Sequence, residues 1–121
     1  AGQSVATRAA ARPMAKALVA WLLQNGASAG EVGKAARAAV DELGFQAEEA
    51  AWVAADGALT AGLRRAAFEG LDPEDTAVWL RVAALACGVP EARATHLVAS
   101  TAAKEAAEHA AAAALSPSEI G

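Results

Sequence analysis

The sequence contains very little of what β-structure is built from. Among its 121 residues there is no tyrosine and there are only 2 phenylalanines, and valine and isoleucine never form alternating runs. Strands are enriched in β-branched and aromatic residues, so almost nothing in the chain predicts a sheet. About a third of the residues are alanine, and glycine and proline stand as isolated residues between helical stretches. This composition predicts an all-α fold.

The chain also lacks the features of a disulfide-linked or membrane-spanning protein. Its single cysteine, Cys87, excludes an internal disulfide and any cysteine-based metal cluster. No run of about 18 apolar residues is present, so no membrane-spanning helix and no membrane partner are predicted. The N-terminus does not show the charged-then-apolar plan of a signal peptide. We therefore expect a cytoplasmic protein in a reducing compartment.

Positive charge is scarce as well. The formal net charge is -4, and the basic residues are scattered, with Arg64-Arg65 as the one adjacent pair. A general nucleic-acid binder would show a basic face, so this distribution argues against one. Residues 1–30 differ, because they carry three basic residues and no acid. That stretch fits either an arm for an anionic partner or a frayed terminus.

Proline positions define the predicted ends of the domain. Pro13 is tolerated in the first turn of a helix and predicts a helix start, preceded by a flexible segment over residues 1–12. The Ser-Pro pair at 116–117 predicts the end of the last helix. We expect one helical domain over residues 13–116, followed by a tail over 117–121, because a chain of this length fits a single core.

Capping signals divide this domain into five or six short helices that form a compact bundle. Ser28, with a glutamate three residues later, predicts a capping box that opens a helix ending at Gly44. Asp56-Gly57 is a turn signal and predicts a break or kink, after which Thr60 would cap a further helix. Short links between the helices are expected throughout.

A weak internal repeat with a period of 44 residues runs through the middle of the chain. Ser28 aligns with Asp72 as an N-cap, and Gly44 aligns with Gly88 as a corner. Asp72 is also the clearest helix start, since a proline and two acids follow it. The repeat fits either two pseudo-repeated helix-corner-helix halves or the ordinary pattern of a helical bundle.

Large apolar side chains predict which faces point inward. In the helix that follows Asp72, Val78, Val82 and Leu85 form the expected inward stripe. The 3 tryptophans lie on or beside the stripes of three separate helices: Trp21, Trp52 and Trp79. We expect these rings to fill the core, with a flat ligand between them as the alternative.

The last predicted helix, from Pro90 to about Leu115, has no large apolar residue between Val98 and Leu115. Burial of its alanines would yield little hydrophobic free energy at about 25 cal/mol per Å². A second helix could nevertheless approach it closely. With 55% hydrophobic and 20% charged residues, we expect uncovered apolar surface that a homo-oligomer or a protein partner would cover. The sequence therefore predicts a non-enzymatic interaction or assembly module, whose expected face is Ala103, Ala106, Ala110 and Ala114.

The alternative hypothesis is a DNA-binding regulator or an accessory to one, acting through residues 80–100. This stretch resembles bacterial helix-turn-helix regulators over some 20 residues, with a glycine at the corner. Its recognition helix would present Arg93, Thr95 and His96 to base edges or phosphates. Glu91 opposes this hypothesis, because it stands at the start of that helix and would repel a phosphate.

No arrangement of residues points to catalysis, to a metal or to a cofactor. His96 resembles the phosphate acceptor of histidine phosphotransfer domains, but Ala99 replaces the lysine that those domains carry. Glu105 and His109 share a helix face without a matching set of metal ligands on other helices. Cys87 sits at a helix C-terminus, where the dipole disfavours a thiolate, and is predicted to be a buried filler. No glycine-rich phosphate loop, Ser-His-Asp set or HExxH motif occurs.

Two long stretches, WLLQNGASAGEVGKAARAAVDELGF and LDPEDTAVWLRVAALACGVPEARATHL, resemble the TerB-type helical domains of tellurite-resistance and related stress proteins. In that family a helix ends in an Asp-Gly turn, and an acidic helix start follows. Asn25-Gly26 and Cys87-Gly88 occupy the turns here, so the acidic cation-site character of the family would be largely lost. The resemblance implies a helical fold over most of the chain and no transferable function.

Overall fold

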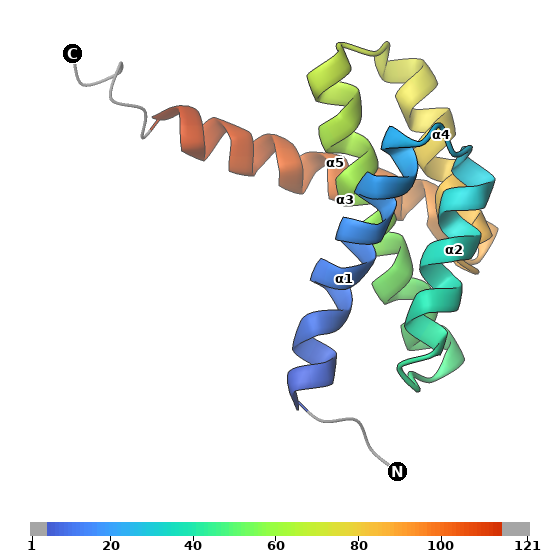
Figure 1. Cartoon of the computed structure of the whole chain (residues 1–121). Helices are drawn as coiled ribbons and strands as arrows, with labels where there is room; N and C mark the ends of the chain where they lie inside the picture. The colour runs from blue at the N-terminus through green and yellow to red at the C-terminus, as the bar shows by residue number, and fades with distance from the viewer. Residues whose placement is uncertain (1–4, 115–121) are drawn as a thin grey trace.

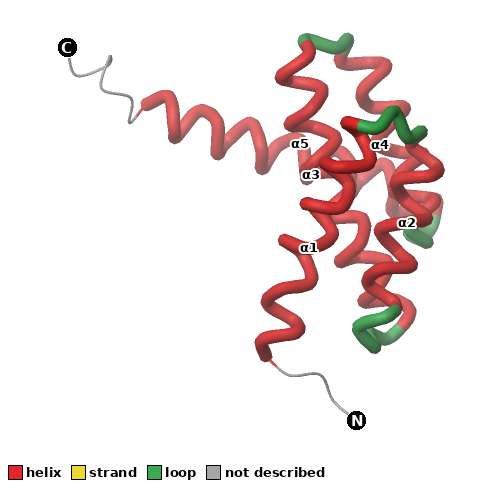
Figure 2. Tube along the Cα trace, in the orientation of Figure 1, coloured by secondary structure: helices red, strands yellow, loops and turns green. Residues whose placement is uncertain are grey.

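The all-α prediction is confirmed: over residues 5–114, which the computed structural model describes, the protein is a bundle of five helices (Figures 1 and 2). They are α1 (Val5–Gln24), α2 (Ala29–Asp41), α3 (Ala47–Glu69), α4 (Pro73–Ala86) and α5 (Glu91–Ala114). Helix α3 is central, because each of the other four packs against it. The predicted tail and the Ser-Pro pair at 116–117 lie outside the described residues.

Helix α1 begins eight residues before the predicted start. It starts at Val5, and Pro13 lies inside it, so the boundary expected at residue 13 is wrong. Packing and ion pairs hold the first half of α1 in place: Ala11 is fully buried, Arg8 donates to Glu49 of α3 at 2.6 Å, and Arg12 pairs with Asp56. The alanines around Pro13 have high helix propensity, which offsets the backbone hydrogen bond that proline cannot donate.

The break predicted at Asp56-Gly57 is also wrong. Helix α3 is continuous, and Thr60 lies within it rather than at a cap. Gly57 is buried against α1, where an added Cβ would lie 2.8 Å from the Cβ of Ala15 and 3.0 Å from the backbone nitrogen of Lys16. Glycine is therefore required here because two helices touch, and no turn is formed.

The caps predicted at Ser28 and Asp72 are confirmed. Ser28 Oγ accepts a hydrogen bond from the N–H of Glu31 at 3.2 Å, and the Ser28 N–H donates to Glu31 Oε1 at 3.0 Å. These hydrogen bonds from Ser28, the backbone one first, hold the pKa of Glu31 below its usual value. Asp72 accepts from the first backbone amides of α4 and is followed by Pro73 at the helix start. These caps satisfy amides that have no partner within the helix.

The two stretches that the 44-residue spacing aligns have similar local structure, which fits both a repeat and the ordinary pattern of a helical bundle. Gly44 and Gly88 adopt φ of 85° and 101°, the left-handed region that favours glycine, at the ends of α2 and α4. The two halves also match in length, since α2 and α3 have 13 and 23 residues and α4 and α5 have 14 and 24. The halves differ in packing, because α3 is surrounded by helices whereas α5 is covered only along its first part.

The core is built from alanine, valine and leucine, and the predicted tryptophan core is wrong. Trp21 is 60% exposed, and Trp52 and Trp79 are half-buried at the edge of the core. The largest fully buried side chains are Leu59, Leu80, Val19, Val32, Val40 and Cys87. Small aliphatic side chains fill the centre of the bundle, and the Trp52 and Trp79 rings pack against this core from outside it.

The predicted inward stripe of α4 is wrong for two of its three residues. Val78 and Val82 are 65% and 44% exposed, whereas Leu85 is half-buried against the core. The inward face consists of Leu80, Ala83 and Ala84 instead. Alanine supplies this face, so the valines are left on the surface.

Candidate interaction site

The second half of α5 leaves the bundle. Ala94 and Thr101 are buried and mark the side of α5 that faces α3 and α4. From Ala106 to Ala112 every side chain is exposed, and Figure 1 shows this part of the helix projecting away from the other four. We call this segment, residues 106–114, the α5 arm.

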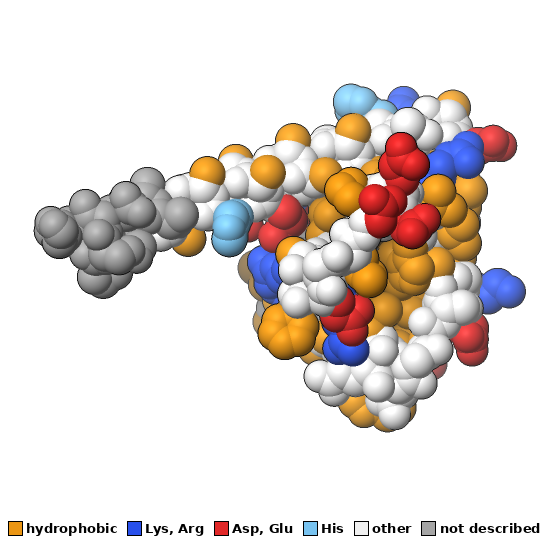
Figure 3. Space-filling model, turned by 90° about the horizontal axis from the view of Figure 1, so that it is seen from above, with side chains coloured by type: hydrophobic (Ala, Val, Ile, Leu, Met, Phe, Trp, Pro, Cys, Tyr) orange, Lys and Arg blue, Asp and Glu red, His pale blue; other side chains and the backbone are white. Residues whose placement is uncertain are grey.

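The predicted alanine face lies on the outer side of α5. Ala103, Ala106 and Ala110 are spaced by three and four residues and therefore share one side of the helix. All three are exposed, and hydrophobic side chains are visible along the projecting helix in Figure 3. Ala114 is the last residue of α5, and its side chain lies outside what the structure describes.

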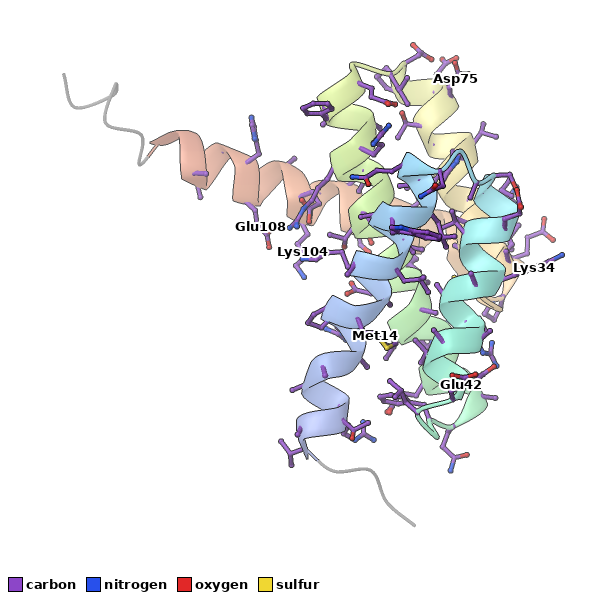
Figure 4. The ribbon with its side chains drawn as sticks, viewed as in Figure 1. Met14, Lys34, Glu42, Asp75, Lys104 and Glu108 are labelled. Carbon is purple, nitrogen blue, oxygen red and sulfur yellow. The ribbon has the colours of Figure 1, made fainter. Side chains whose placement is uncertain are left out.

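An ion pair links α5 to α3 at the point where the arm begins. Glu105 accepts from Arg64 of α3, with an Nε–Oε2 distance of 3.4 Å. Lys104 and Glu108 lie on the same side of α5, beside a hollow between α1, α3 and α5 (Figure 4). Glu105 is thus part of an ion pair, and no group of three metal-ligating residues occurs between residues 5 and 114.

The residues predicted to contact DNA lie together at the start of α5. Arg93, Thr95 and His96 are all exposed, just beyond the corner between α4 and α5. Charges of both signs lie nearby, since Arg93 lines a hollow together with Arg37 and Glu48, and Glu91 pairs with Arg81 at 3.1 Å. The geometry presents the three side chains to solvent in an environment of mixed charge.

Cys87 is a buried filler, as predicted. Its Sγ lies 3.5 Å from the carbonyl oxygen of Gly33, at the contact between α2 and the end of α4. Burial raises the pKa of the Cys87 thiol to about 12, and the charge of nearby Arg37 offsets only part of this effect. The thiolate needed for nucleophilic chemistry is therefore not formed at neutral pH.

We expect Cys87 to react with a thiol reagent at pH 8 about 100-fold or more slowly in the folded protein than in urea, because only the thiolate attacks. The folded pKa is raised above the ordinary value of 9.0. The corresponding stability is therefore present below pH 9 and is lost as pH rises towards 12. Stopped-flow labelling measures the two rates, and a folded rate within about 10-fold of the unfolded one would contradict the assignment.

Sequence reasoning missed a group of large apolar side chains on the surface. The exposed members on the bundle are Trp21, Phe68, Leu71, Val78 and Val82. The alanine content of the sequence could have indicated these exposed residues. When alanines fill the core, larger apolar side chains remain at the surface. Isolated exposed apolar residues are ordinary, whereas a contiguous apolar patch marks an interaction surface.

Comparison with protein-family models, with curated proteins and with solved structures finds no match to this chain. The resemblance to TerB-type domains therefore gains no support. No helix in the described part is both long and apolar enough to cross a membrane.

Proposed function

We propose that the protein is a non-enzymatic cytoplasmic assembly module that binds a protein partner or a second copy of itself through the alanine face of α5. The observation that carries this proposal is the α5 arm, a helical segment in which every side chain from Ala106 to Ala112 is exposed. Alanine has the highest intrinsic helix propensity, so the arm keeps its shape without packing. A preformed helix loses little conformational entropy when it binds.

The chemistry of the arm sets the kind of contact it makes. Its methyl groups allow the backbone of another helix to approach closely, as the alanines and Gly57 allow between α1 and α3. The contact area is small, and interfaces below about 1,200 Å² belong to weak or transient complexes. Association through this face is therefore reversible and depends on protein concentration.

A DNA-binding role through Arg93, Thr95 and His96 is the second candidate. Their exposure beside the corner between α4 and α5 supports it. The carboxylates of Glu48 and Glu91 and the net charge of -4 oppose it. Phosphate binding would release counterions and weaken steeply with salt, whereas an apolar helix contact would not.

Size-exclusion chromatography with light scattering, over a range of protein concentrations, tests the proposal. We expect self-association, or capture of a helical partner, that Ala110→Glu weakens by about 10-fold or more because it buries a charge. Ala112→Glu is the matched control: it lies two residues further on, is equally exposed, and points to the opposite side of the helix.

Two results would contradict the proposal. One is equal weakening by Ala110→Glu and Ala112→Glu, since a specific face must distinguish them. The other is a monomer at all concentrations that elutes with mixed duplex DNA at low salt only, and in which Arg93→Ala abolishes the complex. That second result would establish the DNA-binding role in its place.

A further inference from the structure

An apolar pocket opens at the end of the bundle that is formed by the end of α1, the end of α3 and the start of α4. Its walls include Leu23, Ala66, Leu71 and Trp79, and its volume is about 280 Å³. Trp79 lies against Gly62, where an added Cβ would come 2.5 Å from the ring, so the glycine makes room for the indole. Seen from above, this end shows hydrophobic side chains in a hollow (Figure 3). We call it the Trp79 pocket.

The rim of the Trp79 pocket is acidic. Glu69, Asp72 and Asp75 line it, and Arg65 is the one basic residue among its lining. The charge of Arg65 is already matched, because its Nε donates to Glu69 at 2.8 Å. Asp75 takes part in no ion pair between residues 5 and 114, and acidic side chains are visible beside the hollow in Figure 3. The rim therefore keeps a net negative charge next to an apolar floor.

The size of the pocket limits what it can hold. Pockets that enclose drug-sized molecules measure about 300–1,000 Å³, so this one suits a side chain more than a cofactor. The α5 arm of a second copy does not fit, because its described side chains include no large apolar residue. An apolar side chain with a neighbouring positive charge satisfies both the floor and the rim.

We propose that the Trp79 pocket binds a large apolar side chain of a protein partner, presented on a helix and flanked by lysine or arginine. The apolar side chain contacts Trp79, Leu71 and Leu23, and the flanking cation pairs with Asp75. Exposed Phe68, one residue before the end of α3, extends the apolar surface beyond the pocket. No residue of α5 lines the pocket, so this proposal does not depend on the role of the α5 arm.

A synthetic amphipathic helix with leucines on one face and lysines on the other serves as the probe, with glutamates replacing the lysines in its twin. Each is titrated into the full chain while the three indole N–H signals are followed by NMR. We expect the lysine peptide to shift the Trp79 signal and to bind about 10-fold or more tightly than the glutamate twin. The Trp21 and Trp52 signals report binding elsewhere.

Two pairs of variants separate this site from general attraction to an acidic protein. Asp75→Asn is expected to weaken binding about 3-fold to 10-fold, whereas Glu42→Gln, which removes the same charge at the opposite end of the bundle, changes it less than about 2-fold (Figure 4). Leu71→Ser is expected to weaken binding as well, while Val5→Ser, at a residue that is 84% exposed, leaves it unchanged.

Three results would overturn the inference: no shift of the Trp79 signal, equal weakening by Asp75→Asn and Glu42→Gln, or equal affinity for both peptides. Light scattering on the same samples tests whether a second copy of the chain occupies the pocket instead. If the free chain self-associates and Asp75→Asn abolishes this association, the pocket holds a second copy and the proposed partner is wrong.

Discussion

Replacing Gly33 by alanine is expected to lower the free energy of unfolding by about 1–3 kcal/mol, although the same exchange inside a helix ordinarily raises it by about 1 kcal/mol. Gly33 is the point at which α2 touches α4. A Cβ added there would overlap the carbonyl oxygen of Ala83 and lie 2.5 Å from the Cβ of Ala86. These atoms belong to a helix backbone and to a short side chain, so they cannot move aside without separating the two helices.

Gly30→Ala is the control for this prediction, because Gly30 lies one turn earlier in α2 and an added Cβ would meet nothing within 4 Å. That substitution is expected to stabilise the protein by about 0.5 kcal/mol through the loss of backbone freedom in the unfolded chain. Urea unfolding of both variants measures the difference. A Gly33→Ala protein as stable as Gly30→Ala would show that the contact between α2 and α4 is looser than the structure indicates.

The glycines explain which parts of the fold could be predicted from the sequence. Gly44 and Gly88 act locally: each ends a helix with positive φ, and neighbouring residues suffice to recognise this role. Gly57 and Gly33 act at a distance, since each is needed by a helix from another part of the chain. Nothing in the residues around Gly57 indicates that Ala15 of α1 packs against it. The Asp-Gly pair taken alone therefore predicts a turn.

The large apolar residues show the same limit. A stripe of Val78, Val82 and Leu85 predicts an inward face only if large side chains must fill the core. In this protein closely packed alanines fill it, and the choice between two faces of α4 depends on where α2 and α3 lie. Helix ends marked by a capping side chain or a glycine with positive φ were predictable because these signals are local. The rotation of each helix was not predictable, because it is a property of the packed bundle.

The same distinction applies to the two candidate surfaces. The exposure of Ala103, Ala106 and Ala110 on α5 could be predicted, because a helical segment without large apolar residues has little reason to be buried. The Trp79 pocket could not, because it requires the Trp79 indole to lie on Gly62 and the ends of α1, α3 and α4 to meet. A pocket formed by residues far apart in the chain has no sequence motif by which it can be predicted.

Leu59→Ala is expected to destabilise the protein by about 2–5 kcal/mol, the usual cost of truncating a fully buried leucine. Leu59 lies in the middle of α3, has no exposed surface, and is among the largest side chains of a core that otherwise consists mainly of alanine and valine. Each buried alanine removes little apolar area from water, so the few leucines supply an unusual share of the hydrophobic free energy.

The surrounding helices are not expected to collapse into the cavity that Leu59→Ala leaves, so the loss of stability should persist. The neighbouring helices already touch through glycine and alanine, so they cannot move closer to fill the space that the leucine leaves. Leu59→Met, which nearly conserves volume, should cost less than about 1.5 kcal/mol and serves as the matched control. Urea unfolding followed by far-UV circular dichroism measures both variants. A loss below about 1 kcal/mol for Leu59→Ala would mean that α3 can rotate to fill the cavity, and that the close helix contacts do not fix its orientation.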